Sequence, residues 1–184
     1  MNQNKNYFIS KVFLLTLAVF SSLFLFSACI ASSLQPPITI PFAIHKKDGK
    51  VVTEFIIKED ANYEFNLKFK YKEHDRAGYL RVRKLVGEVN LGADGDPIFP
   101  GVRTPLDIEI VQLDDPLTGG EHIISNMSGE VFKLTSWGFG AFTKEITRIS
   151  LMPGRYRAII ASKAEVPALE GTSVEFEVRR FFKK

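Results

Sequence analysis

The chain has 184 residues, a single cysteine, and a formal net charge of +3 from 24 lysines and arginines against 21 aspartates and glutamates. This near balance excludes the strongly basic surface with which proteins bind nucleic acid, so we expect no nucleic-acid partner. One cysteine excludes a disulfide framework, and a chain of this length can bury enough apolar surface to fold without one.

The first 28 residues have the layout of a secretory signal peptide. Lys5 and Lys11 give a positively charged start, an apolar run extends from Val12 to Phe26, and small residues precede Cys29. This order predicts a signal peptide over residues 1–28 rather than a helix of the mature protein.

Cys29 lies where a bacterial lipoprotein is cleaved and lipidated. The segment Phe26-Ser27-Ala28-Cys29 resembles the lipobox, whose usual form is Leu, a small residue, Ala or Gly, and then Cys; here Phe26 replaces the Leu. The resemblance implies that Cys29 becomes the first mature residue and carries two or three acyl chains, which anchor a protein without a transmembrane helix. Asp after the cysteine retains such lipoproteins at the inner membrane, so Ile30 implies the outer membrane, facing the periplasm.

Three other interpretations of this segment stay open. Ordinary signal-peptidase cleavage nearby, for example after Ala31, would give a soluble periplasmic protein. The segment could instead stay uncleaved as an anchor helix, or Cys29 could be a buried or chance residue. The position of the only cysteine at the end of such a segment favours lipidation.

Residues 29–37 are predicted to be a lipidated tether, and residues 38–184 a folded domain. Pro36 and Pro37 end any helix and stiffen the chain where the tether meets the domain.

Short alternating segments separated by Gly, Pro and Asp turns predict strands in the rest of the chain. The expected strands are 38–44 with an interruption at Pro41, 51–57, 62–71, 78–86, 106–113, 130–134, 144–151, 156–162 and 173–182, with a loop at 91–104 and a helical turn at 165–169. In the clearest strand Tyr63, Phe65, Leu67 and Phe69 alternate with polar residues, which predicts one buried and one wet face. Strands without intervening helices predict an all-β, antiparallel sandwich or barrel.

The segment from Leu151 to Tyr156 favours the sandwich. Its Pro-Gly turn and following tyrosine resemble the corner of immunoglobulin-like folds, in which the tyrosine hydroxyl bonds back to the backbone. The alternative is a plain turn followed by a core tyrosine.

The mature part also resembles an uncharacterised family of small proteobacterial lipoproteins with an immunoglobulin-like β-sandwich. The resemblance is carried by Ile40-Pro41-Phe42, residues 83–87, Pro100-Gly101 and the segment 151–156. It implies a fold and a location, and no assigned activity.

No group of residues forms a catalytic, metal or cofactor site. His45, His74 and His122 share no spacing that would place two imidazoles on one face, and zinc needs three or four ligands. Ser128 lacks the first glycine of the Gly-x-Ser-x-Gly motif of serine hydrolases. We therefore expect a protein that is not an enzyme and that has no metal or cofactor.

The segment from Ser136 to Phe142 is the candidate partner-binding surface. It places the only tryptophan, Trp137, among glycines, with Phe139 and Phe142 close by, and protein interfaces favour aromatic anchors. The alternative is that Trp137 fills the core. A second candidate, the basic residues of segments 81–84 and 179–184, could face anionic lipid, although a wet sheet face explains them equally well.

Together these features predict a non-enzymatic, lipid-anchored binding protein of the periplasm, bound to the membrane through its N-terminal lipid and to a protein partner through its surface. Lipoproteins of this size often neutralise toxic effectors, so immunity against an effector is the most specific version. The alternative is a structural accessory lipoprotein of an envelope or secretion assembly.

Replacing Cys29 by alanine tests the anchor. Cys29→Ala should abolish membrane association and normal processing, because the thiol is the only acyl acceptor. Fractionation combined with fatty-acid labelling measures both effects. An alanine variant that still sediments with membranes, together with a wild type that takes up no label, would contradict lipidation.

Overall fold

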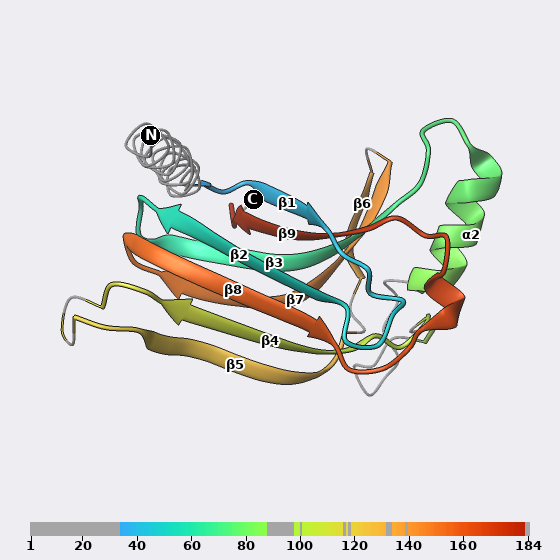
Figure 1. The fold of residues 1–184 in the computed structure, drawn as a ribbon. Coiled ribbons are helices and arrows are strands. Elements are labelled where there is room, and N and C mark those ends of the chain that lie inside the picture. The colour runs from blue at the N-terminus through green and yellow to red at the C-terminus, as the bar shows by residue number, and fades with distance from the viewer. Residues whose placement is uncertain are drawn as a thin grey trace, which may run out of the picture. The chain divides into compact units, whose positions relative to one another are not determined.

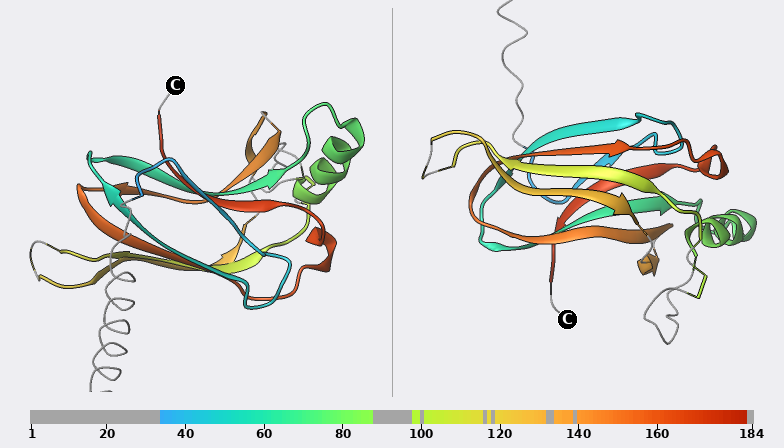
Figure 2. Two further views of the ribbon diagram at one scale, coloured as in Figure 1. Left: turned by 45° about the horizontal axis from the view of Figure 1, so that its top comes forward. Right: turned by 90° about the horizontal axis from the view of Figure 1, so that it is seen from below.

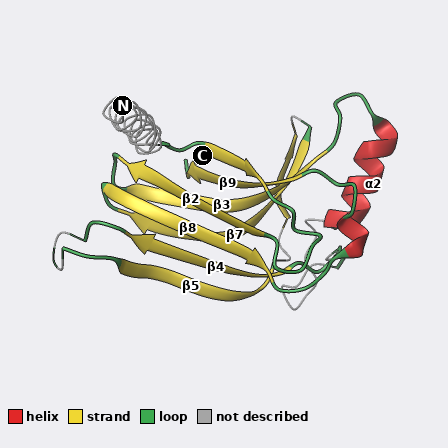
Figure 3. Cartoon of the chain, viewed as in Figure 1, coloured by secondary structure: helices red, strands yellow, loops and turns green. Residues whose placement is uncertain are grey.

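The structure, a computed structural model, describes residues 34–87, 98–99, 101–115, 117, 119–131, 134–138 and 140–182. These residues form two antiparallel sheets that face each other (Figures 1 and 3), so the predicted all-β sandwich is confirmed. The sheets have the strand orders β1-β9-β3-β7-β6 and β2-β8-β4-β5. The elements are β1 (Ile38–Pro41), β2 (Lys50–Ile57), β3 (Ala61–Lys70), α2 (Arg76–Val86), β4 (Pro105–Gln112), β5 (His122–Glu130), β6 (Leu134–Gly138), β7 (Ala141–Leu151), β8 (Gly154–Ser162), η2 (Pro167–Leu169) and β9 (Val174–Arg180).

Aromatic side chains from both sheets fill the space between them. The rings of Phe55 and Tyr156 stack at 5.9 Å between centroids, and Phe65 lies 6.4 Å from Phe55 and 6.3 Å from Phe176. The Tyr156 hydroxyl donates to the carbonyl of Met152 at 2.8 Å, as the resemblance to an immunoglobulin-like corner predicted. This bond fixes the corner where the chain crosses from β7 in one sheet to β8 in the other.

The expected strand over residues 78–86 is wrong, because this segment forms helix α2. Asp75 caps the helix by accepting a hydrogen bond from the Gly78 N–H at 2.9 Å, and the helix ends at Gly87, whose φ of 85° favours glycine. Val82 and Val86 are buried, one turn apart on the same face, where α2 contacts β3 and β7. The alternating arginines of this segment therefore do not form a basic strand.

The expected strand over residues 130–134 does not form as one strand in the described part of the chain. Glu130 ends β5, Leu134 begins β6, and the two strands belong to different sheets, while residues 132 and 133 lie outside the described residues. β5 is an edge strand with most of its residues exposed. The other expected strands are confirmed with ends shifted by a few residues, and the predicted helical turn corresponds to η2. Most of the expected loop at 91–104 lies outside the described residues.

The strand registers define the two ends of the sandwich. Ile57 lies opposite Gly154, Ala61 opposite Leu151, and Arg180 opposite Tyr63, so these strand ends meet at what we call the corner end. α2, η2 and the β6–β7 turn lie at the other end, which we call the helix end (Figures 1 and 2). None of the helices among the described residues has the length and apolar character needed to span a membrane.

Truncating a core side chain of β3 tests this packing. Phe65 is fully buried, so Phe65→Ala should lower the free energy of unfolding by about 3–5 kcal/mol. Asn62→Ala on the same strand is the matched control, and it should change that energy by less than about 0.5 kcal/mol because Asn62 is exposed. Urea unfolding of both variants checks the contrast, and equal losses at the two positions would contradict the packing.

Candidate functional site

A groove of about 1180 Å³ crosses the outer face of the five-stranded sheet. Phe65 and Leu67 of β3 point into the core, so the alternating Glu64 and Lys68 lie on the opposite, outward face. The groove is lined by Pro36, Pro37, Glu64, Lys68, Thr135, Ser136, Trp137, Gly138, Ala141, Thr143, Arg148, Arg179, Arg180, Phe181 and Phe182.

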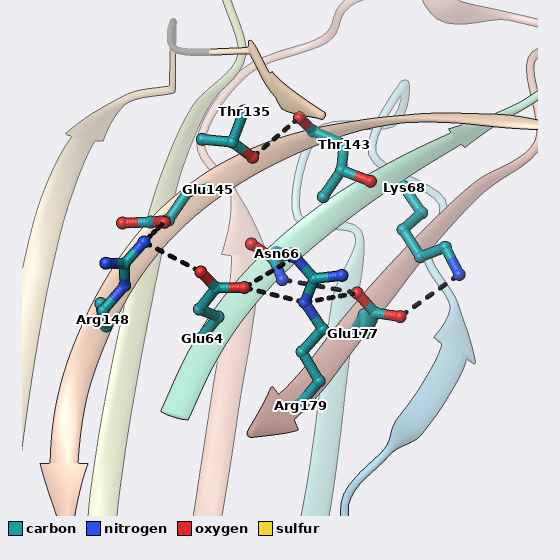
Figure 4. Close-up of polar contacts among 9 residues, drawn as sticks. All are labelled: Glu64, Asn66, Lys68, Thr135, Thr143, Glu145, Arg148, Glu177 and Arg179. Carbon is teal, nitrogen blue, oxygen red and sulfur yellow. Dashed lines mark hydrogen bonds and ion pairs between the residues drawn. The ribbon is translucent and has the colours of Figure 1, made fainter. Parts of the chain in front are cut away.

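The carboxylate of Glu64 holds two arginines from the neighbouring strands (Figure 4). Arg148 Nη2 of β7 lies 2.9 Å from Glu64 Oε1, while Nε and Nη2 of Arg179 on β9 both lie 2.8 Å from Oε2. Only 6% of the Glu64 side chain is exposed, against 36% for Arg148 and 39% for Arg179. A nearly buried carboxylate therefore fixes two guanidinium groups that still reach the solvent.

A second buried carboxylate, Glu177 of β9, continues this network. Glu177 Oε1 lies 3.2 Å from Lys68 Nζ, and Oε2 lies 3.4 Å from the donating Asn66 Nδ2 and 3.7 Å from Arg179 Nε. The Oδ1 atom of the fully buried Asn66 has no hydrogen-bond partner in the described part of the chain. The predicted wet face of β3 is therefore wrong at Glu64 and Asn66, which are covered by side chains of the adjacent strands.

The basic side chains that line the groove are all paired with carboxylates. Glu64 is the only acidic residue among the lining residues, but Lys68 also pairs with Glu177, Arg148 with Glu145, Arg179 with Glu177, and Arg180 with Glu59. Because carboxylates hold the guanidinium groups in place, the groove presents oriented donors suited to carboxylate or phosphate groups.

Aromatic residues border the groove at both ends. Trp137 on the edge strand β6 is 62% exposed, and Phe182 beyond the end of β9 is 72% exposed. Phe181 also lines the groove and stacks on Arg148, whose guanidinium carbon is 3.7 Å from the ring centroid. The groove can therefore contact apolar and anionic groups of one ligand.

The structure separates the residues of the predicted partner-binding segment. Trp137 lies on the surface, at the groove, and not in the core. Phe142 is 2% exposed and packs against Tyr71 and Tyr79 at 5.3 and 5.2 Å, so it belongs to the core and not to the predicted surface. Phe139 and the predicted lipidation site Cys29 lie outside the described residues.

Lys144, next to Thr143 on β7, lies in the core rather than in the groove. Its Nζ is 5.8 Å from the centroid of the Phe69 ring, and burial lowers the pKa of Lys144 to about 8. In the described part of the chain, no three His, Cys, Asp or Glu side chains lie close enough together to hold a metal ion.

Comparison with known proteins identifies the family of the chain. The sequence model of the domain of unknown function DUF5625 matches residues 39–180, so the chain belongs to this family. A crystal structure of a protein from Sulfurospirillum deleyianum is similar, with a TM-score of 0.63 and 23% identity over 80% of this chain and 98% of that one. At this identity the likeness shows the fold alone. No curated protein matches the chain.

Removing one arginine tests the buried network. Arg179→Ala should lower the free energy of unfolding by about 1–3 kcal/mol, because Glu64 keeps only one of its two partners. Glu64→Gln, added to Arg179→Ala, should recover part of this loss because an amide carries no charge to compensate. Chemical unfolding of the single and double variants measures the coupling.

The control is Arg155→Ala. Arg155 pairs with Glu54 and Asp114, and all three side chains are at least half exposed. The substitution should therefore lower the free energy of unfolding by no more than about 0.5 kcal/mol. A loss at Arg179 no larger than at Arg155 would contradict a structural role for the buried carboxylate.

Proposed function

We propose that this member of the DUF5625 family is a non-enzymatic, lipid-anchored binding protein of the bacterial cell envelope, which holds a protein partner in the groove of its five-stranded sheet. The observation that carries the proposal is the exposed Trp137 beside a row of oriented basic side chains in one groove.

The residue types of the groove support a protein-binding role. Tryptophan and arginine are the residues most enriched among those that dominate binding energy. The remaining donors of the oriented guanidinium groups favour a segment of the partner with carboxylates that would meet Arg148 and Arg179, while its apolar side chains would meet Trp137.

The sequence supports the proposed location. The signal-like segment 1–28 and the lipobox-like approach to Cys29 favour an acylated cysteine, with residues 29–37 as the tether. Ile30 favours the periplasmic face of the outer membrane. In this setting the most specific version of the function is immunity, in which the groove captures an effector delivered to the periplasm.

The edge strand β5 favours the second candidate, a structural accessory role in an envelope or secretion assembly. It is nine residues long, and its ends, His122 and Glu130, are its only ionisable residues. Exposed edges without proline or charge are suited to pairing with a strand of another chain.

Substitution of Trp137 tests the groove as the binding surface. Trp137→Ala should leave the melting temperature nearly unchanged, because the side chain is exposed, and should weaken binding of the co-purified partner at least tenfold. Val52→Ala is the matched control: Val52 is 53% exposed and lies on β2 of the other sheet. Thermal melts and titrations with the partner measure both effects.

If Trp137→Ala binds the partner with unchanged affinity, or if Val52→Ala loses as much affinity as Trp137→Ala, the partner does not bind in the groove. If both changes leave binding intact, substitutions along β5 test the accessory role.

A further inference from the structure

Three exposed apolar side chains lie at the tips of separate connections. Leu117, in the β4–β5 loop, is 93% exposed; Met152, in the corner between β7 and β8, is 66% exposed; and Phe182, after β9, is 72% exposed. A single exposed apolar residue is ordinary on a soluble protein, whereas three of them at one end of the molecule offer a contact surface.

All three tips lie at the corner end. Gln112 at the end of β4 lies opposite Tyr156 near the start of β8, which places the β4–β5 loop beside the corner that carries Met152. Arg180 at the end of β9 lies opposite Tyr63 near the start of β3, which places Phe182 at the same end. Figures 1 and 2 show the β4–β5 loop at this end.

The tether also reaches the domain at this end. Leu34, the first described residue, accepts a hydrogen bond from Ile56, next to the last residue of β2, at 2.9 Å. Cys29 precedes Leu34 by five residues, which span at most about 18 Å. An acyl anchor on Cys29 would therefore keep the corner end close to the bilayer surface.

We propose that the corner end contacts the lipid bilayer directly, with Leu117, Met152 and Phe182 inserted into the interface between head groups and acyl chains. This inference rests on the proposed lipid anchor. Apolar and aromatic side chains are the groups that enter this interface. The contact orients the long axis of the sandwich roughly perpendicular to the membrane plane. It also places the Phe182 end of the groove next to the lipid.

The charges at the corner end select the kind of lipid surface. Asp114 pairs with Arg155 at 3.5 Å, Glu121 pairs with Arg157 at 2.7 Å, and Glu59 pairs with Arg180. In the described part of the chain these three arginines are each paired with a carboxylate, so their charges are already balanced. The proposed contact is therefore apolar in origin and does not require an anionic surface.

Environment-sensitive probes on single added cysteines test the contact. Full-length Leu117→Cys and Met152→Cys proteins are purified from membranes, labelled with a nitrobenzoxadiazole dye and reconstituted in phosphatidylcholine vesicles. Both probes should shift to shorter emission wavelengths and be quenched by spin labels in the bilayer. Because the attraction is apolar, the shift should persist at about 1 M salt, where charges are screened beyond about 3 Å.

Leu80→Cys is the matched control, because Leu80 is 50% exposed on α2 at the helix end, and its probe should emit as in water. The wild type should take up no dye, because acylation occupies its only thiol. Vesicle-bound protein whose Leu117 and Met152 probes emit as in water would overturn the membrane contact and leave the anchor standing. Labelling of wild-type Cys29, or no vesicle association, would overturn the anchor and the contact together. A shift at Leu80 equal to that at Leu117 would overturn the end-on orientation.

Discussion

The buried carboxylate of Glu64 on the central strand β3 is the constraint on which the five-stranded sheet depends. Its bonds to Arg148 on β7 and Arg179 on β9 join the three middle strands of that sheet on their outer face. A buried ion pair contributes little net stability compared with an apolar replacement, but breaking one is costly. The network therefore opposes alternative registers of these strands, since any slip would leave a carboxylate buried without its partners.

The arginines that hold Glu64 also form the wall of the groove, so fold and site share the same side chains. Substitution of Arg148 or Arg179 changes stability and the charge presented to a ligand together, whereas Trp137 and Phe182 contact no buried charge and can be changed independently. This difference lets binding and folding be separated by experiment. The ion pairs belong to the wall of the groove, and the exposed aromatic side chains belong to its border.

The sequence predicts the parts of this structure that depend on local periodicity. The prediction that Phe65 and Leu67 are buried is correct, because a period of two places both side chains on the core face of the strand. Helix α2 is missed because alternating Leu80 and Val82 suggest a strand, although the Asp75 cap and the spacing of Val82 and Val86 were available signals. β5 is missed because its polar interior has little alternation.

The groove could not be predicted, because Glu64 meets partners that lie 84 and 115 residues further along the chain. These separations also set the order in which the ion pairs of Glu64 can form during synthesis. A chain that emerges from its N-terminus presents β3 and β7 before β9 exists, so Glu64 can pair with Arg148 but lacks its second partner until almost the entire sequence is available. The β3–β9 side of this network is therefore the last that can close. A product truncated before Arg179 would retain most of the strands but lack the pair between Arg179 and Glu64. Its sheet would be incomplete, and such a product is a substrate for quality-control proteases.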